Sequence, residues 1–211
     1  MSLEQPPEVH APHAPHGRSR WLEMLVSISA LAVSAVSIFI ALQHGNTMEK
    51  LVAANSIPYV EIMSGNAVRG ADGEFHQGIL LELRNLGVGP ANVRSVRLLT
   101  DGRPVRNVDE WVAMCCDGDA ARAAETVTTM DFVLNQSATH FVPAGENAML
   151  VYAPRTEENA EAFIRVDGVR VRSQIEICYC SVFDECWRRT SSGDEPERVP
   201  ACAAPADRFI P

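Results

Sequence analysis

The chain has 211 residues and a formal net charge of −9, from 27 acidic and 18 basic side chains. Three of the acids and two of the bases lie before residue 45, so 24 acids face 16 bases in the rest of the chain. Such an acidic protein repels phosphate backbones and anionic lipid headgroups, which argues against a nucleic acid partner. Without its tails and its apolar segment, the chain has room for one domain of about 130 to 140 residues, long enough to bury its own core.

Residues 1–20 are predicted to form a disordered cytoplasmic tail. They are rich in proline and have few apolar side chains to bury. His10, His13 and His16 recur at every third position, which would align them on one face of a polyproline II helix. Weak metal binding is one interpretation of this spacing, and an unstructured spacer is the interpretation that we prefer.

A transmembrane helix is predicted at residues 21–44. Its centre, Leu25–Leu42, has eighteen residues without a charge, a proline or a glycine. At about 1.5 Å per residue this centre spans roughly 27 Å, close to the ~30 Å hydrocarbon core of a bilayer. Trp21 stands where an interfacial aromatic residue is expected. A buried core helix is one alternative, but nothing else in the chain is large enough to surround it.

A cleaved signal peptide is the stronger alternative for this segment. Its apolar core would be about 7 to 15 residues long and would be followed closely by a small-x-small cleavage site. The segment ends at Leu42–Gly45 without such a site, and the nearest candidate, Val52–Ala54, lies too far along the chain. We therefore expect an uncleaved anchor.

The charges that flank the segment predict its orientation. Arg18 and Arg20 precede the helix, whereas the other side has only Lys50, which lies beside Glu49. By the positive-inside rule, the N-terminus is expected in the cytoplasm and residues 45–211 outside it.

Small residues form a stripe along the predicted membrane helix. Such stripes let transmembrane helices approach closely, and hydroxyl groups can bond across the contact. The stripe predicts self-association or the binding of a partner helix, and the alternative is that serine and alanine are simply tolerated here. Its members recur at spacings of three and four: Ser27, Ala30, Ser34, Ser37 and Ala41.

The residues after the anchor divide into three parts. Residues 45–57 are predicted to continue as a helical stalk, which Pro58 ends. Residues 58–190 show alternating or short apolar runs between glycine and proline turns, which is typical of a mainly β, antiparallel sandwich. Residues 191–211 are predicted to be an irregular tail.

Several segments of the predicted sandwich have the patterns of individual elements. Asp101-Gly102 is expected to form a hairpin turn, Asn107–Met114 a short helix or loop turn, and Glu157–Ile164 a helix. The expected strands are Tyr59–Met63, Gly78–Arg84, Ala91–Thr100, Thr126–Leu134, Ala148–Ala153 and Arg172–Val182.

One stretch carries a resemblance to a known kind of domain. Residues 81–105, LELRNLGVGPANVRSVRLLTDGRPV, resemble a strand–turn–strand of immunoglobulin-like β-sandwich domains in bacterial surface and periplasmic proteins. A membrane helix running into LVAANSIPYVEI resembles small uncharacterised bacterial single-pass membrane proteins of this type. The resemblance implies an immunoglobulin-like ectodomain on the periplasmic side of a bacterial inner membrane. It carries no catalytic residues, and a fold alone does not supply a function.

The cysteines predict disulfide bridges. An even number of cysteines, all after the anchor, fits an exported disulfide framework. Cys180 and Cys186 would lie opposite one another across a hairpin turned at Val182–Asp184, so we expect a bridge between them. Cys202 would pin the tail to Cys178 or to either member of the adjacent pair, and this choice stays open. The six cysteines are Cys115, Cys116, Cys178, Cys180, Cys186 and Cys202.

A metal site and a redox site are the alternatives for these cysteines. The spacing C-x-C-x5-C has no C-x2-C pair and no nearby histidine, so it is weak by zinc criteria. The pair Cys115-Cys116 lacks the C-x-x-C spacing that brings a thiolate to a helix N-terminus. We therefore expect structural bridges or simple burial, and no cofactor.

The sequence contains no common catalytic motif. The nucleophile elbow, the H-E-x-x-H zinc motif, the P-loop and the dinucleotide fingerprint are all missing. The leading interpretation is a non-catalytic, membrane-anchored interaction or accessory module that binds another protein. The alternatives are an envelope enzyme whose site is assembled from distant residues, and a thiol-based envelope sensor that uses Cys115 and Cys116.

Overall fold

A computed structural model describes residues 19–70, 72–135, 141–193, 195–203 and 205–211. The chain divides into two compact units, Met1–Leu51 and Val52–Pro211. Most of the tail predicted at residues 1–20, including its three histidines, lies outside the described residues.

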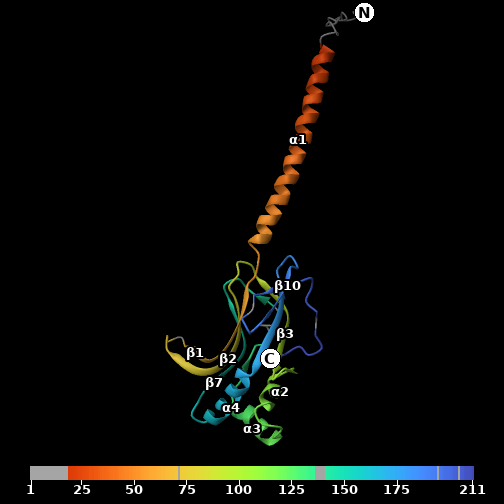
Figure 1. The fold of residues 1–211 in the computed structure, drawn as a ribbon. Coiled ribbons are helices and arrows are strands. Elements are labelled where there is room, and N and C mark those ends of the chain that lie inside the picture. The colour runs from red at the N-terminus through yellow and green to blue at the C-terminus, as the bar shows by residue number, and fades with distance from the viewer. Residues whose placement is uncertain (1–18, 71, 136–140, 194, 204) are drawn as a thin grey trace, which may run out of the picture. The chain divides into compact units, whose positions relative to one another are not determined.

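The helix α1 (Ser19–Ala54) covers the predicted membrane helix and most of the predicted stalk without a break (Figure 1). Its large apolar side chains between Trp21 and Leu42 are exposed on all sides, so no protein core surrounds them. Its serine hydroxyls donate to carbonyl oxygens of the same helix, as lipid surroundings would require. By length and composition, α1 is able to cross a membrane.

The second unit contains two antiparallel sheets. The first sheet has the order β1-β2-β7-β5, and the second has the order β10-β9-β8-β3-β4, with β6 also paired to β3. The strands of the first sheet are β1 (Val60–Arg69), β2 (Phe75–Asn85), β7 (Asn147–Pro154) and β5 (Val133–Leu134). Those of the second are β10 (Glu197–Val199), β9 (Cys186–Thr190), β8 (Ser173–Cys180), β3 (Ala91–Thr100), β4 (Arg103–Val105) and β6 (Phe141–Val142).

The two sheets share one core, which makes the unit sandwich-like. Alternate residues of β2, namely Ile79, Leu81 and Leu83, are buried, as are Ile175 and Ile177 of β8. Every second side chain of a strand lies on the same face of its sheet. The buried faces of the two sheets pack against each other and form a single hydrophobic cluster. The predicted antiparallel sandwich is confirmed at this level.

Three short helices close the end of the sandwich at which β8 begins (Figure 1). They are α2 (Val108–Ala113), α3 (Ala120–Thr129) and α4 (Ala160–Val171), and α4 connects β7 of one sheet to β8 of the other. Trp111 of α2 is fully buried, and its indole nitrogen donates to Ser173 Oγ at 2.9 Å. This bond satisfies the polar atom of the largest core side chain.

The strand predicted at Thr126–Leu134 is wrong for most of its length. Residues up to Thr129 belong to α3, and only Val133–Leu134 forms a strand. The helix is favoured because Asp119 caps it, accepting a hydrogen bond from Arg122 N at 3.1 Å, and because several alanines follow.

The tail also differs from the expectation of an irregular segment. β10 forms within it and pairs with β9, and Phe209 is 1% exposed. Phe209 N donates to Val96 O at 2.8 Å, so the tail returns to β3 and packs a large aromatic side chain against the core. A lone aromatic residue in a polar segment gives no periodicity from which this packing could be predicted.

One buried side chain organises the end of the domain at which β1 begins and β2 ends. Asn85, the last residue of β2, is fully buried. Its Oδ1 accepts from Tyr59 N at 3.2 Å and from Gly87 N at 3.1 Å. Its Nδ2 donates to Gly89 O at 2.8 Å and to Val142 O at 3.0 Å. The amide thus makes four hydrogen bonds that join β2, the following loop, β6 and the incoming chain.

Two glycines allow the loop to lie directly against the incoming chain. A Cβ atom on Gly87 would stand 2.6 Å from Ile57 O, and one on Gly89 would stand 2.6 Å from Ser56 Cα. Both clashes are with backbone, which cannot rotate away. The sequence N-L-G-V-G-P is therefore explained by one buried amide and by two positions where only glycine fits.

Gly89→Ala is expected to lower the free energy of unfolding by about 1–3 kcal/mol, because its methyl group would overlap the backbone of Ser56. The control is Gly168→Ala on α4, where a Cβ would meet nothing within 4 Å. That change should leave stability unaltered or raise it by about 0.4–1 kcal/mol. Denaturant unfolding of the two variants measures both effects, and equal losses would contradict the close approach at Gly89.

Candidate functional site

One end of the domain carries two loops with exposed apolar side chains. We call these loops, residues 86–90 and 181–185, the tip. The ladder between β3 and β8 makes them neighbours, because β3 begins just after the first loop and β8 ends just before the second. Four large apolar side chains of the tip are exposed: Leu86, Val88, Val182 and Phe183.

The first loop of the tip lies against residues 57–59, which precede β1. Leu86 N donates to Tyr59 O at 2.8 Å, and Gly89 N donates to Ile57 O at 3.3 Å. The side chains of Ile57 and Tyr59 are themselves partly exposed, at 42% and 38%. Single apolar side chains are common on protein surfaces, but several large ones on adjoining loops often mark a binding site.

Both loops of the tip are held rigidly. Asn85 fixes the first loop by the bonds described above. In the second loop, Ser181 Oγ accepts from Phe183 N at 3.2 Å and from Glu185 N at 3.3 Å, and Ser181 N donates to Glu185 O at 2.8 Å. Ordered loops lose little conformational entropy on binding, so the apolar side chains are presented to a partner in a preorganised state.

The two sheets are tied together just below the tip. Arg189 of β9 lies over the ring of Tyr59, with the guanidinium carbon 4.8 Å from the ring centroid, and donates to Val60 O at 3.4 Å. Val60 N donates to the hydroxyl of Tyr179 at 3.4 Å. Burial raises the pKa of the Tyr179 phenol, which therefore remains neutral at neutral pH.

Two bridges lie near the hairpin of β8 and β9. Cys180 and Cys186 are opposite one another in the ladder, with Cα atoms 4.0 Å apart, and they form a disulfide as the hairpin pattern predicted. The bridge from Cys202 goes to Cys178, which is one of its three candidate partners. This second bridge joins residues 24 apart in sequence and attaches the tail to β8. None of the six cysteines is free.

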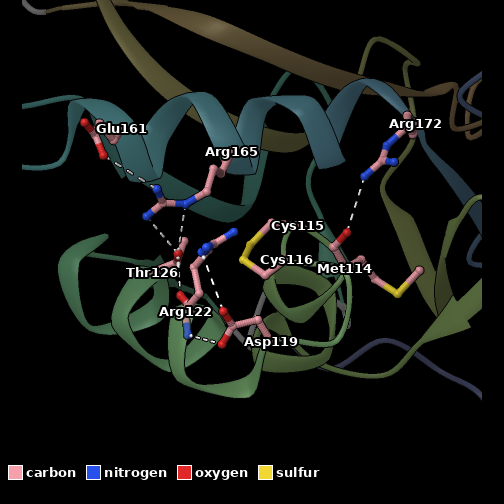
Figure 2. The surroundings of a disulfide bond; sticks show 9 residues. All are labelled: Met114, Cys115, Cys116, Asp119, Arg122, Thr126, Glu161, Arg165 and Arg172. Atoms are coloured by element: carbon pink, nitrogen blue, oxygen red, sulfur yellow. Dashed lines mark hydrogen bonds and ion pairs between the residues drawn. A yellow bond between two sulfur atoms is a disulfide. The ribbon is translucent and has the colours of Figure 1, made fainter.

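The third bridge joins the adjacent residues Cys115 and Cys116 to each other, and neither of them is bonded to Cys202. Figure 2 shows it in the turn between α2 and α3, below α4. Arginine side chains lie near it, and their guanidinium groups donate hydrogen bonds. Arg165 donates to Thr126 Oγ1 at 3.1 Å, and Arg172 donates to Met114 O at 3.4 Å. A ring closed between neighbours removes few unfolded conformations, so this bridge contributes little stability by chain entropy.

The tail is held by an ion pair as well as by its bridge. Asp207 accepts hydrogen bonds from Arg97 of β3, the shortest at 2.7 Å, and Glu176 of β8 lies 3.4 Å from the same guanidinium. The hydrogen bonds from Arg97 hold the pKa of the Asp207 carboxyl below its usual range. The same bonds raise the pKa of Arg97, so the pair is ionised throughout the neutral range.

The described residues contain one group that could hold a metal ion, formed by Cys180, Cys186 and Cys202. All three sulfurs are engaged in bridges, so they are not thiolate ligands in this state. His76 of β2 pairs with Asp72 at 2.9 Å in an exposed position. His44 lies on α1 in the other unit, and His140 lies outside the described residues.

The small-residue stripe of α1 is exposed along its whole length: Ser27, Ala30, Ser34, Ser37 and Ala41. Ser27, Ser34 and Ser37 each donate to the carbonyl oxygen four residues earlier at 2.8 Å. A helix partner for this face therefore stays a prediction.

No known family model matches the chain, and no curated protein matches it either. The candidate site therefore depends on geometry alone. Sequence reasoning missed the tip, although a signal was present, since Leu86 and Val88 are large apolar residues inside a glycine turn. Turns are usually polar, so apolar side chains there suggest a contact outside the core.

Asp207→Asn is expected to make the free energy of unfolding less dependent on pH in the acid range. Because the folded-state pKa of Asp207 lies below its ordinary value of 3.8, the carboxylate stabilises the fold above that value. This contribution disappears as the pH falls through the folded-state pKa. The melting temperature of each protein is measured from pH 6 down to pH 2, about the ordinary carboxyl range. The melting temperature of the wild type should fall toward that of Asp207→Asn at the acid end. Asp184→Asn removes an exposed pair with Arg94 and should keep the wild-type pH profile.

Proposed function

We propose that this protein is a membrane-anchored interaction module. In this proposal α1 spans a bacterial inner membrane, and the domain is an immunoglobulin-like β-sandwich in the periplasm that binds another protein without catalysis of its own. The observation that carries the proposal is the tip, where four exposed apolar side chains stand on two rigid loops.

The chemistry of the tip favours a protein surface as its ligand. Rigid loops with a few large apolar side chains are typical of the central contacts of protein interfaces, where a small number of residues supply most of the affinity. Each such side chain contributes about 1.5–3 kcal/mol when it is fully buried. A membrane anchor favours a partner that is itself in or at the membrane, because tethering raises the effective concentration of nearby partners.

Two independent features support the orientation. Bridged cysteines are typical of oxidising compartments outside the cytoplasm, and every cysteine of the chain follows α1. The arginines Arg18 and Arg20 precede the apolar segment, in agreement with the positive-inside rule.

A membrane-impermeant amine reagent tests the orientation on intact cells. Lys50 is the only lysine of the chain and follows the apolar segment, whereas the N-terminal amine precedes it. We expect labelling of Lys50 and protection of the N-terminal amine, with both labelled after the membrane is dissolved in detergent. Labelling of the N-terminal amine alone in intact cells would reverse the orientation, and a chain that starts after residue 44 would identify a cleaved signal peptide.

Charged substitutions test the tip. The double change Leu86→Asp and Val88→Asp should lower recovery of the partner in affinity capture of the full-length protein from mild detergent by at least about tenfold, which corresponds to about 1.4 kcal/mol. The matched control is Ile164→Asp with Val171→Asp on α4, which are exposed apolar residues at the helical end of the domain. The control should keep the partner, and both proteins should unfold at the wild-type denaturant concentration. Equal losses in both variants, or capture of the protein alone, would contradict binding through the tip.

A further inference from the structure

The bridges Cys178–Cys202 and Cys180–Cys186 lie in direct contact with one another. Cys180 Sγ is 3.7 Å from Cys202 Sγ, and these two sulfurs and Cys186 Sγ all lie within 4.8 Å of one another. The contact arises because Cys178 and Cys180 project from the same strand, so that the tail bound to the first is laid beside the second. Cys178 Sγ does not belong to the close group.

The two bridges differ in their exposure to solvent. Cys180 and Cys186 are 2% and 4% exposed, whereas Cys178 and Cys202 are only partly buried. Cys178 also lines a hollow of about 240 Å³ between the tail and the outer face of β3, β8 and β9. A small thiol is therefore able to reach the Cys178–Cys202 bridge, while the Cys180–Cys186 bridge is shielded.

We propose that the two bridges form one exchange-coupled thiol–disulfide site, which reacts with a small external thiol at Cys178 and transmits the exchange through Cys202 to Cys180 and Cys186. This inference goes beyond the proposed function, because it concerns the bridges and not the exposed side chains of the tip.

The proposed exchange has two steps. The external thiolate attacks Cys178 Sγ, forms a mixed disulfide there, and displaces Cys202 as a thiolate. Once released from Cys178, the Cys202 side chain rotates until its thiolate lies in line with the Cys180–Cys186 bond, starting from a contact of 3.7 Å with Cys180 Sγ. It then attacks Cys180 Sγ, forms a Cys202–Cys180 bridge, and displaces Cys186 as a thiolate, which takes a proton from water. Each step breaks one S–S bond and forms another, so no further oxidant or reductant is consumed.

The surroundings of Cys186 suit a thiol product. Its sulfur lies 3.4 Å from the carbonyl oxygen of Asp184, which is placed to accept a hydrogen bond from a newly formed thiol. After the exchange the tail remains attached to β8 through Cys180. The covalent closure of the hairpin that carries the loop 181–185 is lost, so the reaction would loosen one of the two loops of the tip.

Single cysteine variants of the full-length protein test the exchange. Cys178→Ser leaves a thiol on Cys202, beside the second bridge, whereas Cys202→Ser leaves a thiol on Cys178, outside the close group. After incubation at neutral pH, free thiols are alkylated and located by peptide mass mapping. We expect label on both Cys202 and Cys186 in Cys178→Ser, in amounts within about tenfold of each other, which corresponds to a difference of about 1.4 kcal/mol between the pairings. In Cys202→Ser we expect label on Cys178 alone.

The wild-type protein supplies an arm that does not depend on the folding of a variant. Limited treatment with the monothiol 2-mercaptoethanol should produce a Cys202–Cys180 bridge together with label on Cys186, and the rate should rise about tenfold per pH unit below the pKa of the reagent. The proposal is overturned if label in Cys178→Ser stays on Cys202 alone, or if the treated wild type releases only Cys202. Neither outcome would affect partner binding through the tip, so the two proposals fail separately.

Discussion

The hydrogen bonds of the Asn85 side chain hold the first residues of the β-domain against the loop after β2 and against β6. A fully buried amide that lacked partners would cost about 1–3 kcal/mol for each unsatisfied group, but here both donors and both acceptor sites are used. Its partners come from β6, from the loop after β2 and from the chain arriving from α1. The same amide therefore fixes the start of β1 and the shape of one loop of the tip.

The two units of the chain differ in where their apolar side chains lie. The domain buries its apolar side chains between two sheets, whereas α1 exposes its apolar side chains on every face. In water that exposure would be unfavourable, and in lipid it costs nothing. A continuous helix also satisfies its own backbone hydrogen bonds, which lipid cannot do.

The covalent bridges and the tail complete the second sheet. β10 and Phe209 come from the last residues of the chain, and they are held by the Cys178–Cys202 bridge and by Asp207 bound to Arg97. The tail thereby covers part of the outer face of β8, where Cys178 lies. The same bridge that attaches the tail brings a sulfur atom within 3.7 Å of the Cys180–Cys186 bridge, so stabilisation and the proposed exchange have one structural origin.

By itself the sequence determined the local features of this protein. Eighteen consecutive residues without a charge, a proline or a glycine predict a helix able to cross a membrane, period-two patterns predict β2, β3, β7 and β8, and the spacing of Cys180 and Cys186 predicts a hairpin pair. The sequence N-L-G-V-G-P predicts a turn, but it does not explain why both glycines are needed. They are needed because Gly87 and Gly89 contact the backbone of residues about 30 positions earlier. Only the tertiary structure decided which cysteine joins Cys202, how Phe209 reaches the core, and that two apolar loops form one tip. The strand predicted at Thr126–Thr129 is a different case, because the cap at Asp119 and the alanines after it are local signals that favour a helix over the β-branched residues. The other three features depend on contacts between residues far apart in the chain, whereas periodicity and spacing report only on neighbours.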